Sequence, residues 1–265
     1  GWWGAFASGS SFAGNYIGTG TVGTTDMGNG EDGIQLDTGA SNNTIGGTSV
    51  AARNIIGGNN NAGIALDDTA TTGNIILGNW IGAGANGSTQ VANSHNGIHI
   101  NGATGTLIGD GTAAGRNVIA GNSMSGVGIV DATGTVVAGN WIVYNILDGV
   151  TVYSNTANTV IGGGSGAAGN LIAHNSGDGI LVRDATASAT VLANSIYANG
   201  QRGIDLADNG YDTNDLNDTD TGANGRQNFP VLTSASANAS GGSFVGALNS
   251  TANTSFRIDF YANRP

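Results

Sequence analysis

Aspartates that recur at matching places of a repeated phrase are the residues that could perform acid–base chemistry in this sequence. Asp37 and Asp67 each close a Gly-Ile-x-Leu-Asp phrase, and Asp68 follows the second phrase directly. Asp148 and Asp178 each stand immediately before the glycine of a similar phrase. If the repeats stack, each pair of carboxyl groups lies about 5 Å apart, which is the separation that retaining glycosidases use.

Two interpretations of these aspartates stay open. One is a polysaccharide hydrolase or lyase, in which a pair supplies the acid and the base or nucleophile. The other is that aspartate favours turns, with Arg202 offering Asp178 an ordinary surface ion pair. Because any two stacked turn positions share this spacing, we assign no catalytic residue and expect the protein not to be an enzyme.

A second group of candidates lies in the acidic segment "DNGYDTNDLNDTDTGANGRQNFP". Calcium takes six to eight oxygen ligands in a flexible geometry, and closely spaced aspartates and asparagines supply such ligands. The segment lacks the glycine and terminal glutamate of the EF-hand loop, so a solvated acidic linker is the alternative. No organic cofactor is indicated, and the three histidines share no partner at ligand spacing. The candidate calcium ligands are Asp212, Asn214, Asp215, Asn217, Asp218 and Asp220.

Most of these candidates lie in a sequence repeat of 23 to 34 residues. Each of its seven copies contains a glycine followed by an apolar-x-apolar triplet. Such a period predicts stacked structural units. Asparagine stands four residues before each of those glycines, and a second row of asparagines begins an Asn-x-Ile phrase in each copy. The first row is Asn29, Asn59, Asn93, Asn122, Asn145, Asn175 and Asn199. The second row is Asn15, Asn54, Asn79, Asn117, Asn140, Asn170 and Asn194.

Each copy contains three short apolar runs in period-two alternation, which indicates strands rather than helices. Three strands per repeat predict a parallel β-helix, in which each strand pairs with its equivalent one coil away at about 4.8 Å. The asparagines then occupy turns. Their side-chain amides can bond from coil to coil, or they can be present because asparagine tolerates left-handed turn conformations.

Three phrases of the repeat resemble sequences of a known family of repeat proteins. They are "NNTIGGTSVAARNIIGGNNNAGIAL", "GTAAGRNVIAGN" and "NTVIGGGSGAAGNLIAHN". They resemble the right-handed parallel β-helix repeats of the pectate-lyase-like superfamily, and more closely the repeat arrays of large secreted or cell-surface bacterial proteins. The resemblance implies an extracellular or cell-surface location. It selects no activity, because the superfamily includes lyases, hydrolases, epimerases, adhesins and spacers.

We therefore expect an all-β fold, a right-handed parallel β-helix of about seven to eight three-stranded coils followed by a short antiparallel β segment. The predicted boundaries are residues 1–208 for the β-helix, 209–228 for the acidic linker or calcium loop, and 229–265 for the antiparallel segment. That last segment contains three strand-like phrases, "FPVLTSASA", "GSFVGALNS" and "TSFRIDFYANRP", and resembles the start of a β-sandwich that is incomplete here.

A row of large apolar residues is predicted on the outside of the third strand. In each Asn-x-Ile phrase the middle residue must point away from the buried isoleucine. An exposed apolar stripe of this length is expected to be covered or to bind a partner. The loops after Ile17 and Ile81 can cover it, another protein can bind along it, or a glycan can stack on Tyr16, Trp80 and Trp141. We call this row the sheet-3 stripe, and it comprises Tyr16, Ile55, Trp80, Val118, Trp141 and Leu171.

Composition excludes some partners. The chain has 265 residues with 18 acidic residues, seven arginines, no lysine and a net charge of −11. Nucleic acid and anionic membrane surfaces are therefore not expected partners, and no apolar run is long enough for membrane insertion. We expect a structural or adhesive segment of an extracellular bacterial surface or matrix protein that associates with copies of itself or other surface proteins. The alternative is a carbohydrate-active enzyme or glycan-binding module on a β-helix scaffold.

Overall fold

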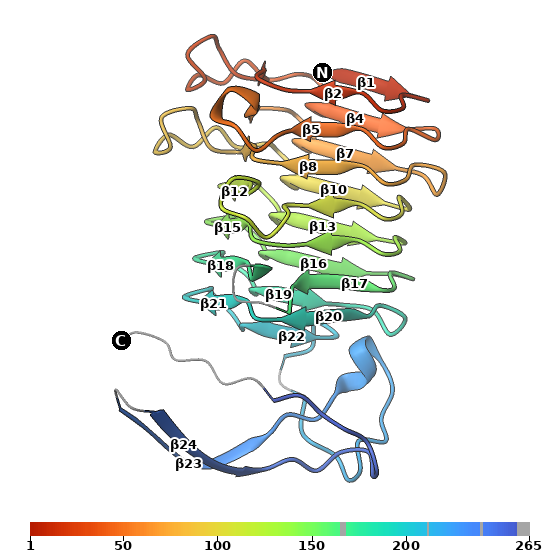
Figure 1. Cartoon of the computed structure of the whole chain (residues 1–265), viewed down its shortest axis with the longest axis vertical. Helices are drawn as coiled ribbons and strands as arrows, with labels where there is room; N and C mark the ends of the chain where they lie inside the picture. Colours follow the sequence, from red (N-terminus) through yellow and green to blue (C-terminus); the bar gives the residue numbers. More distant parts are fainter. Residues whose placement is uncertain (165–167, 211, 239–240, 259–265) are drawn as a thin grey trace.

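The computed structural model describes residues 1–164, 168–210, 212–238 and 241–258. Its main body is a stack of three-stranded coils that forms three parallel sheets of eight, seven and seven strands (Figure 1). This arrangement is the predicted parallel β-helix.

The strands follow one another in a fixed rotation from sheet to sheet along the chain. Sheet 1 contains β1 (Trp2–Ala5), β4 (Ile34–Asp37), β7 (Ile64–Asp67), β10 (Ile98–Asn101), β13 (Val127–Val130), β16 (Val150–Tyr153), β19 (Ile180–Val182) and β22 (Ile204–Leu206). Sheet 2 contains β2 (Ser11–Phe12), β5 (Thr44–Gly46), β8 (Ile75–Leu77), β11 (Leu107–Ile108), β14 (Val136–Val137), β17 (Thr159–Gly162) and β20 (Ala189–Leu192). Sheet 3 contains β3 (Tyr16–Ile17), β6 (Ile55–Ile56), β9 (Trp80–Ile81), β12 (Val118–Ala120), β15 (Trp141–Val143), β18 (Leu171–Ala173) and β21 (Ser195–Tyr197).

The core is a column of isoleucine, leucine and valine side chains inside the coils. Every strand pairs in register with its equivalent in the next coil, so that Ile64 lies between Ile34 and Ile98. All three side chains are completely buried. Because side chains alternate between the two faces of a strand, this register turns the intervening residues of each strand outward.

The two predicted asparagine rows are hydrogen-bonded ladders that run along the stack. In the first ladder Asn59 Nδ2 donates to Asn93 Oδ1 at 2.7 Å, and in the second Asn54 Nδ2 donates to Asn79 Oδ1 at 2.9 Å. The same pattern links Asn29 to Asn199 and Asn15 to Asn194 through every coil between them. These asparagines are not in the left-handed conformation, so the turn-tolerance interpretation is wrong for them.

Left-handed backbone occurs instead at residues that precede the ladder asparagines, such as Gly78 before Asn79, and at glycines that directly follow strands. Gly82, which follows β9, has φ at +83°. A Cβ atom placed there would lie 2.2 Å from the carbonyl oxygen of Ala120 in the next coil, so no larger side chain fits without moving the backbone. The close stacking of coils therefore accounts for part of the high glycine content.

The chain leaves the last coil through the acidic segment and then forms a two-stranded antiparallel hairpin, β23 (Val231–Asn238) and β24 (Gly241–Ala247). Two short 3₁₀ helices, η1 (Val50–Ala52) and η3 (Ala223–Arg226), complete the described elements. The third strand-like phrase forms no strand in its described part, residues 254–258, and residues 259–265 lie outside the described residues. Within the described ranges, no helix has the length and apolar character needed to cross a membrane.

Candidate functional site

The first predicted carboxylate pair lies at one edge of sheet 1 and shares a single amide. Gln35 Nε2 lies 3.4 Å from Asp37 Oδ2 and 3.3 Å from Asp67 Oδ2. Asp37 Oδ2 also accepts a hydrogen bond of 2.7 Å from the indole of Trp3, which is largely exposed. The structure thus brings the two carboxylates to one shared amide, with an accessible indole bonded to Asp37.

The electrostatic surroundings of this pair are acidic. Burial raises the pKa of Asp67, and the negative charges of Asp32 and Asp37 raise it further. Burial likewise raises the pKa of Asp32. The third candidate, Asp68, has a different position, because its carboxylate accepts the backbone N–H groups of Ala70 and Thr38 and so closes the turn after the strand.

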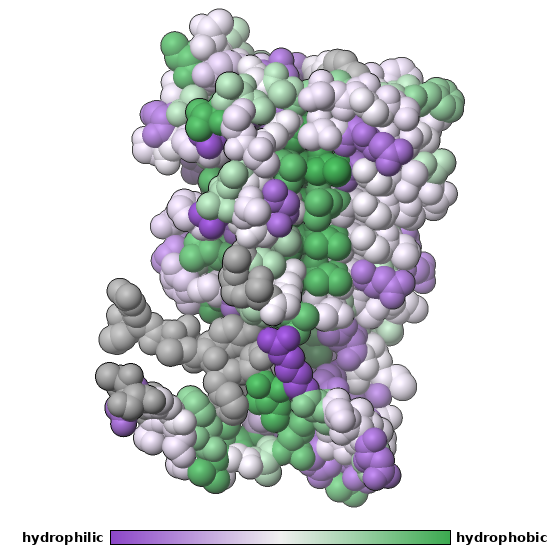
Figure 2. All heavy atoms as spheres, in the orientation of Figure 1, coloured by the Kyte–Doolittle hydropathy of each residue, from purple (hydrophilic) through white to green (hydrophobic). Residues whose placement is uncertain are grey.

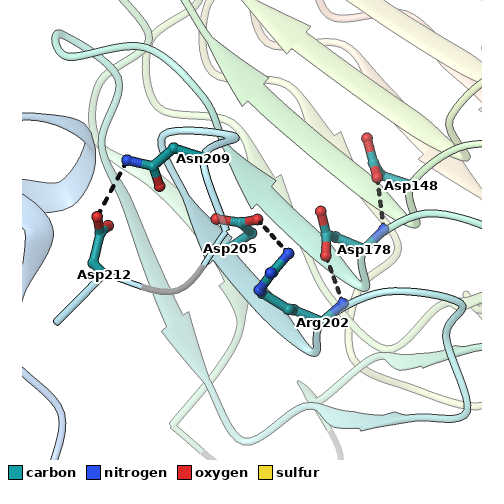
Figure 3. Close-up of polar contacts among 6 residues, drawn as sticks. All are labelled: Asp148, Asp178, Arg202, Asp205, Asn209 and Asp212. Carbon is teal, nitrogen blue, oxygen red and sulfur yellow. Dashed lines mark hydrogen bonds and ion pairs between the residues drawn. The ribbon is translucent and has the colours of Figure 1, made fainter.

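The second predicted pair, Asp148 and Asp178, bonds to backbone rather than facing a common space. Asp148 Oδ1 accepts the N–H of Asp178 at 2.7 Å, and Asp178 Oδ1 accepts the N–H of Arg202 at 2.6 Å (Figure 3). The guanidinium of Arg202 does not pair with Asp178, as the sequence suggested, but with Asp205 Oδ2 at 3.2 Å. These contacts give each carboxylate a structural explanation.

The side chains immediately before the repeat glycines also form hydrogen bonds from coil to coil, which the sequence did not lead us to predict. Where the residue before the repeat glycine is aspartate or asparagine, its side chain accepts the backbone N–H of the equivalent residue in the next coil, as Asp32 does from Ala62 and Asn96 does from Ser125. The recurrence of Asp, Asn and Ser immediately before those glycines is the signal that could have shown it. Sequence reasoning also missed that Asp205 is buried: its side chain is 2 % exposed, and burial together with the charge of Asp178 raises its pKa.

The sheet-3 stripe lies in one row, because its members are direct partners in neighbouring strands. Loops lie against two of its aromatics. A Cβ atom at Gly23 would be 2.4 Å from the Tyr16 ring, and one at Gly87 would be 3.3 Å from the Trp80 ring. Ile55 between them is buried. The N-terminal half of the stripe is therefore partly covered by its own loops.

Two arginines stack on the tryptophans of the stripe. The guanidinium of Arg53 lies 4.4 Å from the centre of the Trp80 ring, and that of Arg116 lies 4.7 Å from the Trp141 ring. Such cation–π contacts hold an aromatic ring in a fixed orientation. Trp141 stays 44 % exposed despite this contact.

Three further aromatics, Tyr144, His174 and Tyr197, lie directly after or within the last three strands of sheet 3. The rings of Tyr144 and His174 stack in parallel, with centroids 4.9 Å apart, and His174 meets Tyr197 edge-on at 5.8 Å. Tyr144 is 59 % exposed and Tyr197 40 %. We call Trp141, Tyr144, His174 and Tyr197 the aromatic row. Tyr144 and His174 were missed because they occupy left-handed corner positions directly before ladder asparagines, outside the strand alternation.

A hollow of about 290 Å³ adjoins the aromatic row. It is lined by Tyr144, by the loop after β9 and by the end of β12. The lining residues are small, hydroxyl-bearing or amide-bearing, and none of those described there is charged. They are Gly82, Ala83, Gly87, Ser88, Thr89, Gln90, Ala120, Gly121 and Tyr144.

The acidic segment brings together three of its six predicted ligands. One carboxylate oxygen from each of Asp215, Asp218 and Asp220 lies within 4.8 Å of the others. Asp212 instead pairs with Arg226 at 3.6 Å, Asn214 bonds to the backbone of Phe229, and Asn217 bonds through its backbone N–H to Asn249. Burial and the charges of Asp215 and Asp218 raise the pKa of Asp220.

No protein-family model and no curated protein matches the sequence. Among solved structures, a mutant of the periplasmic alginate epimerase AlgG is similar over 68 % of this chain, with a TM-score of 0.51 and 16 % identity. The chain covers 40 % of that protein. AlgG itself matches with 25 % identity, 68 % and 37 % coverage, and a TM-score of 0.47. At these values the likeness concerns the fold alone, and the chain is a right-handed parallel β-helix repeat protein.

Proposed function

We propose that this chain is a glycan-binding β-helix protein that acts outside the cytoplasm, with the aromatic row and the adjoining hollow as its docking site. The observation that carries the proposal is the exposed, parallel stack of Tyr144 and His174 at the rim of an uncharged, hydroxyl- and amide-lined hollow. Glycan binding also accommodates the adhesive surface protein expected from the sequence.

The chemistry of this surface suits a sugar. Aromatic rings supply large, rigid contact area with polar edges, and the C–H faces of a pyranose ring can cover such rings. Binding hollows also place a few convergent polar groups that fix the orientation of the ligand. Ser88 and Thr89 offer hydroxyl groups. Gln90, whose Nε2 already donates to the carbonyl of Gly121, offers its amide oxygen as an acceptor.

A neutral glycan fits better than a polyanionic one. The alginate epimerase with the similar fold acts on a polyuronate, but this chain has a net charge of −11, which opposes binding of a polyanion. None of the described residues that line the hollow is cationic, and Arg116 is engaged on the Trp141 ring. We therefore propose neutral hexose polymers or oligosaccharides as ligands.

The test is binding of a panel of neutral and acidic oligosaccharides, measured by a glycan array and then by calorimetry. We expect Tyr144→Ala and Trp141→Ala each to weaken the binding of a neutral ligand at least about tenfold, which corresponds to roughly 1.4 kcal/mol. Tyr16→Ala is the matched control, because Tyr16 belongs to the same stripe but lies against its own loop. Unchanged affinity in both variants, or binding of acidic glycans alone, contradicts the proposal.

A second candidate function is supported by the Gln35-bridged pair. A half-buried carboxyl group with a raised pKa beside a second carboxylate is the arrangement of a general acid with its partner base or nucleophile. Release of reducing ends from a neutral polysaccharide, abolished by Asp67→Asn, would establish a hydrolase. Binding without release in the same assay would leave the glycan-binding function alone.

A further inference from the structure

The corner residues beside the hollow come from three consecutive coils, and one of them lacks a side chain. Gly121, Tyr144 and His174 directly precede the ladder asparagines that follow β12, β15 and β18, which are neighbours in the stack (Figure 1). All three have left-handed backbone, with φ at +71°, +58° and +58°. The Tyr144 ring therefore has an aromatic corner neighbour in the following coil and only a glycine in the preceding one.

One face of the Tyr144 ring is covered and the other adjoins the hollow. The His174 ring lies parallel to it with centroids 4.9 Å apart, which is close to the spacing of about 4.8 Å between neighbouring strands. The two rings are therefore stacked along the axis of the β-helix. Every other residue that lines the hollow precedes Tyr144 in the chain and belongs to the coils of β9 and β12. The hollow thus lies on the side of Tyr144 that His174 leaves free.

The side chain of Gln90 lies over Gly121 in this hollow. A Cβ atom at Gly121 would be 2.4 Å from Gln90 Nε2, and that nitrogen donates to the carbonyl oxygen of Gly121 at 2.5 Å. Because a carbonyl oxygen can only accept, the nitrogen of the amide must face Gly121 and its oxygen must face away. Gln90 is exposed, and no donor within the described residues bonds to its Oε1. The hollow therefore contains an accessible acceptor in a defined position.

The loop that carries Gln90 is held in place by its own hydrogen bonds. Asn86 Oδ1 accepts the N–H groups of Ser88 and Thr89, and Asn86 Nδ2 donates to Thr89 Oγ1 at 2.9 Å. At the base of the loop, Ala83 and Gln90 pair in an antiparallel bridge. Groups that are already oriented before a ligand arrives lose less conformational entropy on binding. The acceptor of Gln90 is therefore preorganised beside the free face of Tyr144.

We infer that the hollow holds a single pyranose ring, which stacks on Tyr144 and donates one hydroxyl hydrogen bond to Gln90 Oε1, an assignment that rests on the glycan binding proposed above. The hollow of about 290 Å³ lies just below the range of about 300–1,000 Å³ for drug-sized ligands, so it has room for one ring rather than several. A site that bonds a ligand hydroxyl discriminates against analogues that lack it, because its own polar group is then left unpaired. Gln90 is therefore the residue that determines which sugar is bound.

The experiment titrates the chain with the methyl glycosides of glucose, galactose and mannose by NMR, and then with monodeoxy and mono-O-methyl derivatives of the glycoside that binds best. We expect one ring position at which both derivatives bind about fivefold more weakly, because each lacks the hydroxyl donor. Gln90→Met keeps a side chain of similar length without the amide, and it should bind parent and derivatives within about twofold of one another. Gln201→Met, at an exposed glutamine outside the hollow, should keep the preference.

The ratio of the two affinities separates a direct contact from a structural role of Gln90. A loosened loop weakens parent and derivative alike, so a preference lost in Gln90→Met and kept in Gln201→Met supports the contact. Equal binding of all derivatives, a preference that survives Gln90→Met, or binding of oligosaccharides without any methyl glycoside overturns it and leaves glycan binding intact. If Gln90→Met fails to fold by circular dichroism, the derivative series with the unaltered chain decides alone. If no neutral glycan binds at all, the proposed function fails and this assignment with it.

Discussion

A single ladder asparagine shows how this fold is stabilised at the level of the residue. Asn122 is completely buried, donates to Asn145 Oδ1 at 3.0 Å and to the carbonyl of Ile81 at 3.3 Å, and accepts from Asn93 Nδ2 at 2.9 Å. Removing the side chain leaves several buried groups without partners, and each such group costs about 1–3 kcal/mol.

We therefore expect Asn122→Ala to lower the free energy of unfolding by about 1–3 kcal/mol or more. Urea denaturation followed by circular dichroism measures the change. Asn155→Ala is the control, because Asn155 is exposed, and its replacement should change stability by less than about 0.5 kcal/mol. An unaltered midpoint for Asn122→Ala would mean that the ladder bonds contribute nothing net.

His99 gives a pH dependence with a definite sign. Burial, with a further contribution from His95, lowers the pKa of His99 from 6.5 to about 4. Between these values the unfolded chain binds a proton at this position and the folded chain does not, so stability rises as pH increases from about 4 to 6.5. The raised pKa of Asp67 acts in the opposite direction above 3.8.

We expect the stability advantage of the unaltered chain over His99→Gln to grow between pH 4 and pH 6.5, as measured by urea unfolding at half-unit steps. Comparison with the variant isolates the histidine, because the carboxyl groups contribute to both proteins. A constant difference across this range would show that His99 titrates alike in the folded and unfolded chain.

At the scale of the element, the strands and the ladders were predictable, but most contacts of the candidate sites were not. The apolar alternation is a pattern of neighbouring residues within one coil, and the asparagines recur at fixed places of the repeat. Both patterns can be read directly from the sequence. Which group Asp148 or Asp178 contacts depends on the backbone of the adjacent coil. The corner residues Tyr144 and His174 lie outside the strand alternation, so their stacking emerges only when consecutive coils are superposed.

A glycine beside the coil stack should tolerate substitution only where the neighbouring coil leaves room and the backbone is not left-handed. Gly82→Ala combines left-handed backbone with a Cβ atom 2.2 Å from a carbonyl oxygen, and we expect it to destabilise the chain by more than about 2 kcal/mol. Gly164 has no atom within 4 Å of such a Cβ and no positive φ, so Gly164→Ala should be nearly neutral. Thermal unfolding of both variants tests the comparison, and equal melting temperatures would contradict it.

At the scale of the whole molecule, a second apolar stripe that the sequence analysis missed runs along sheet 2. Ile75, Leu107, Val136 and Val160 are successive partners in their strands and are all partly exposed. Figure 2 shows a hydrophobic band that follows the coils on the face turned to the viewer. Contiguous apolar patches of this kind commonly mark protein interaction surfaces.

We expect concentration-dependent self-association through this stripe. Sedimentation velocity across the micromolar range should show an increasing weight-average mass for the unaltered chain and a constant monomer mass for Leu107→Asp. Thr190→Asp serves as the control, because it adds the same charge to the outward row of the last sheet-2 strand. A monomer at all concentrations would show that the stripe is not used for self-association.

The stacking direction also determines how the molecule would respond to a pulling force. Backbone and ladder hydrogen bonds between coils run parallel to the long axis of the stack, so tension applied along that axis loads them one coil at a time rather than all together. Each coil that peels away releases 23 to 34 residues, or about 80–120 Å of chain. The protein would therefore lengthen in a series of similar steps and act as an extensible tether that absorbs mechanical work before it breaks.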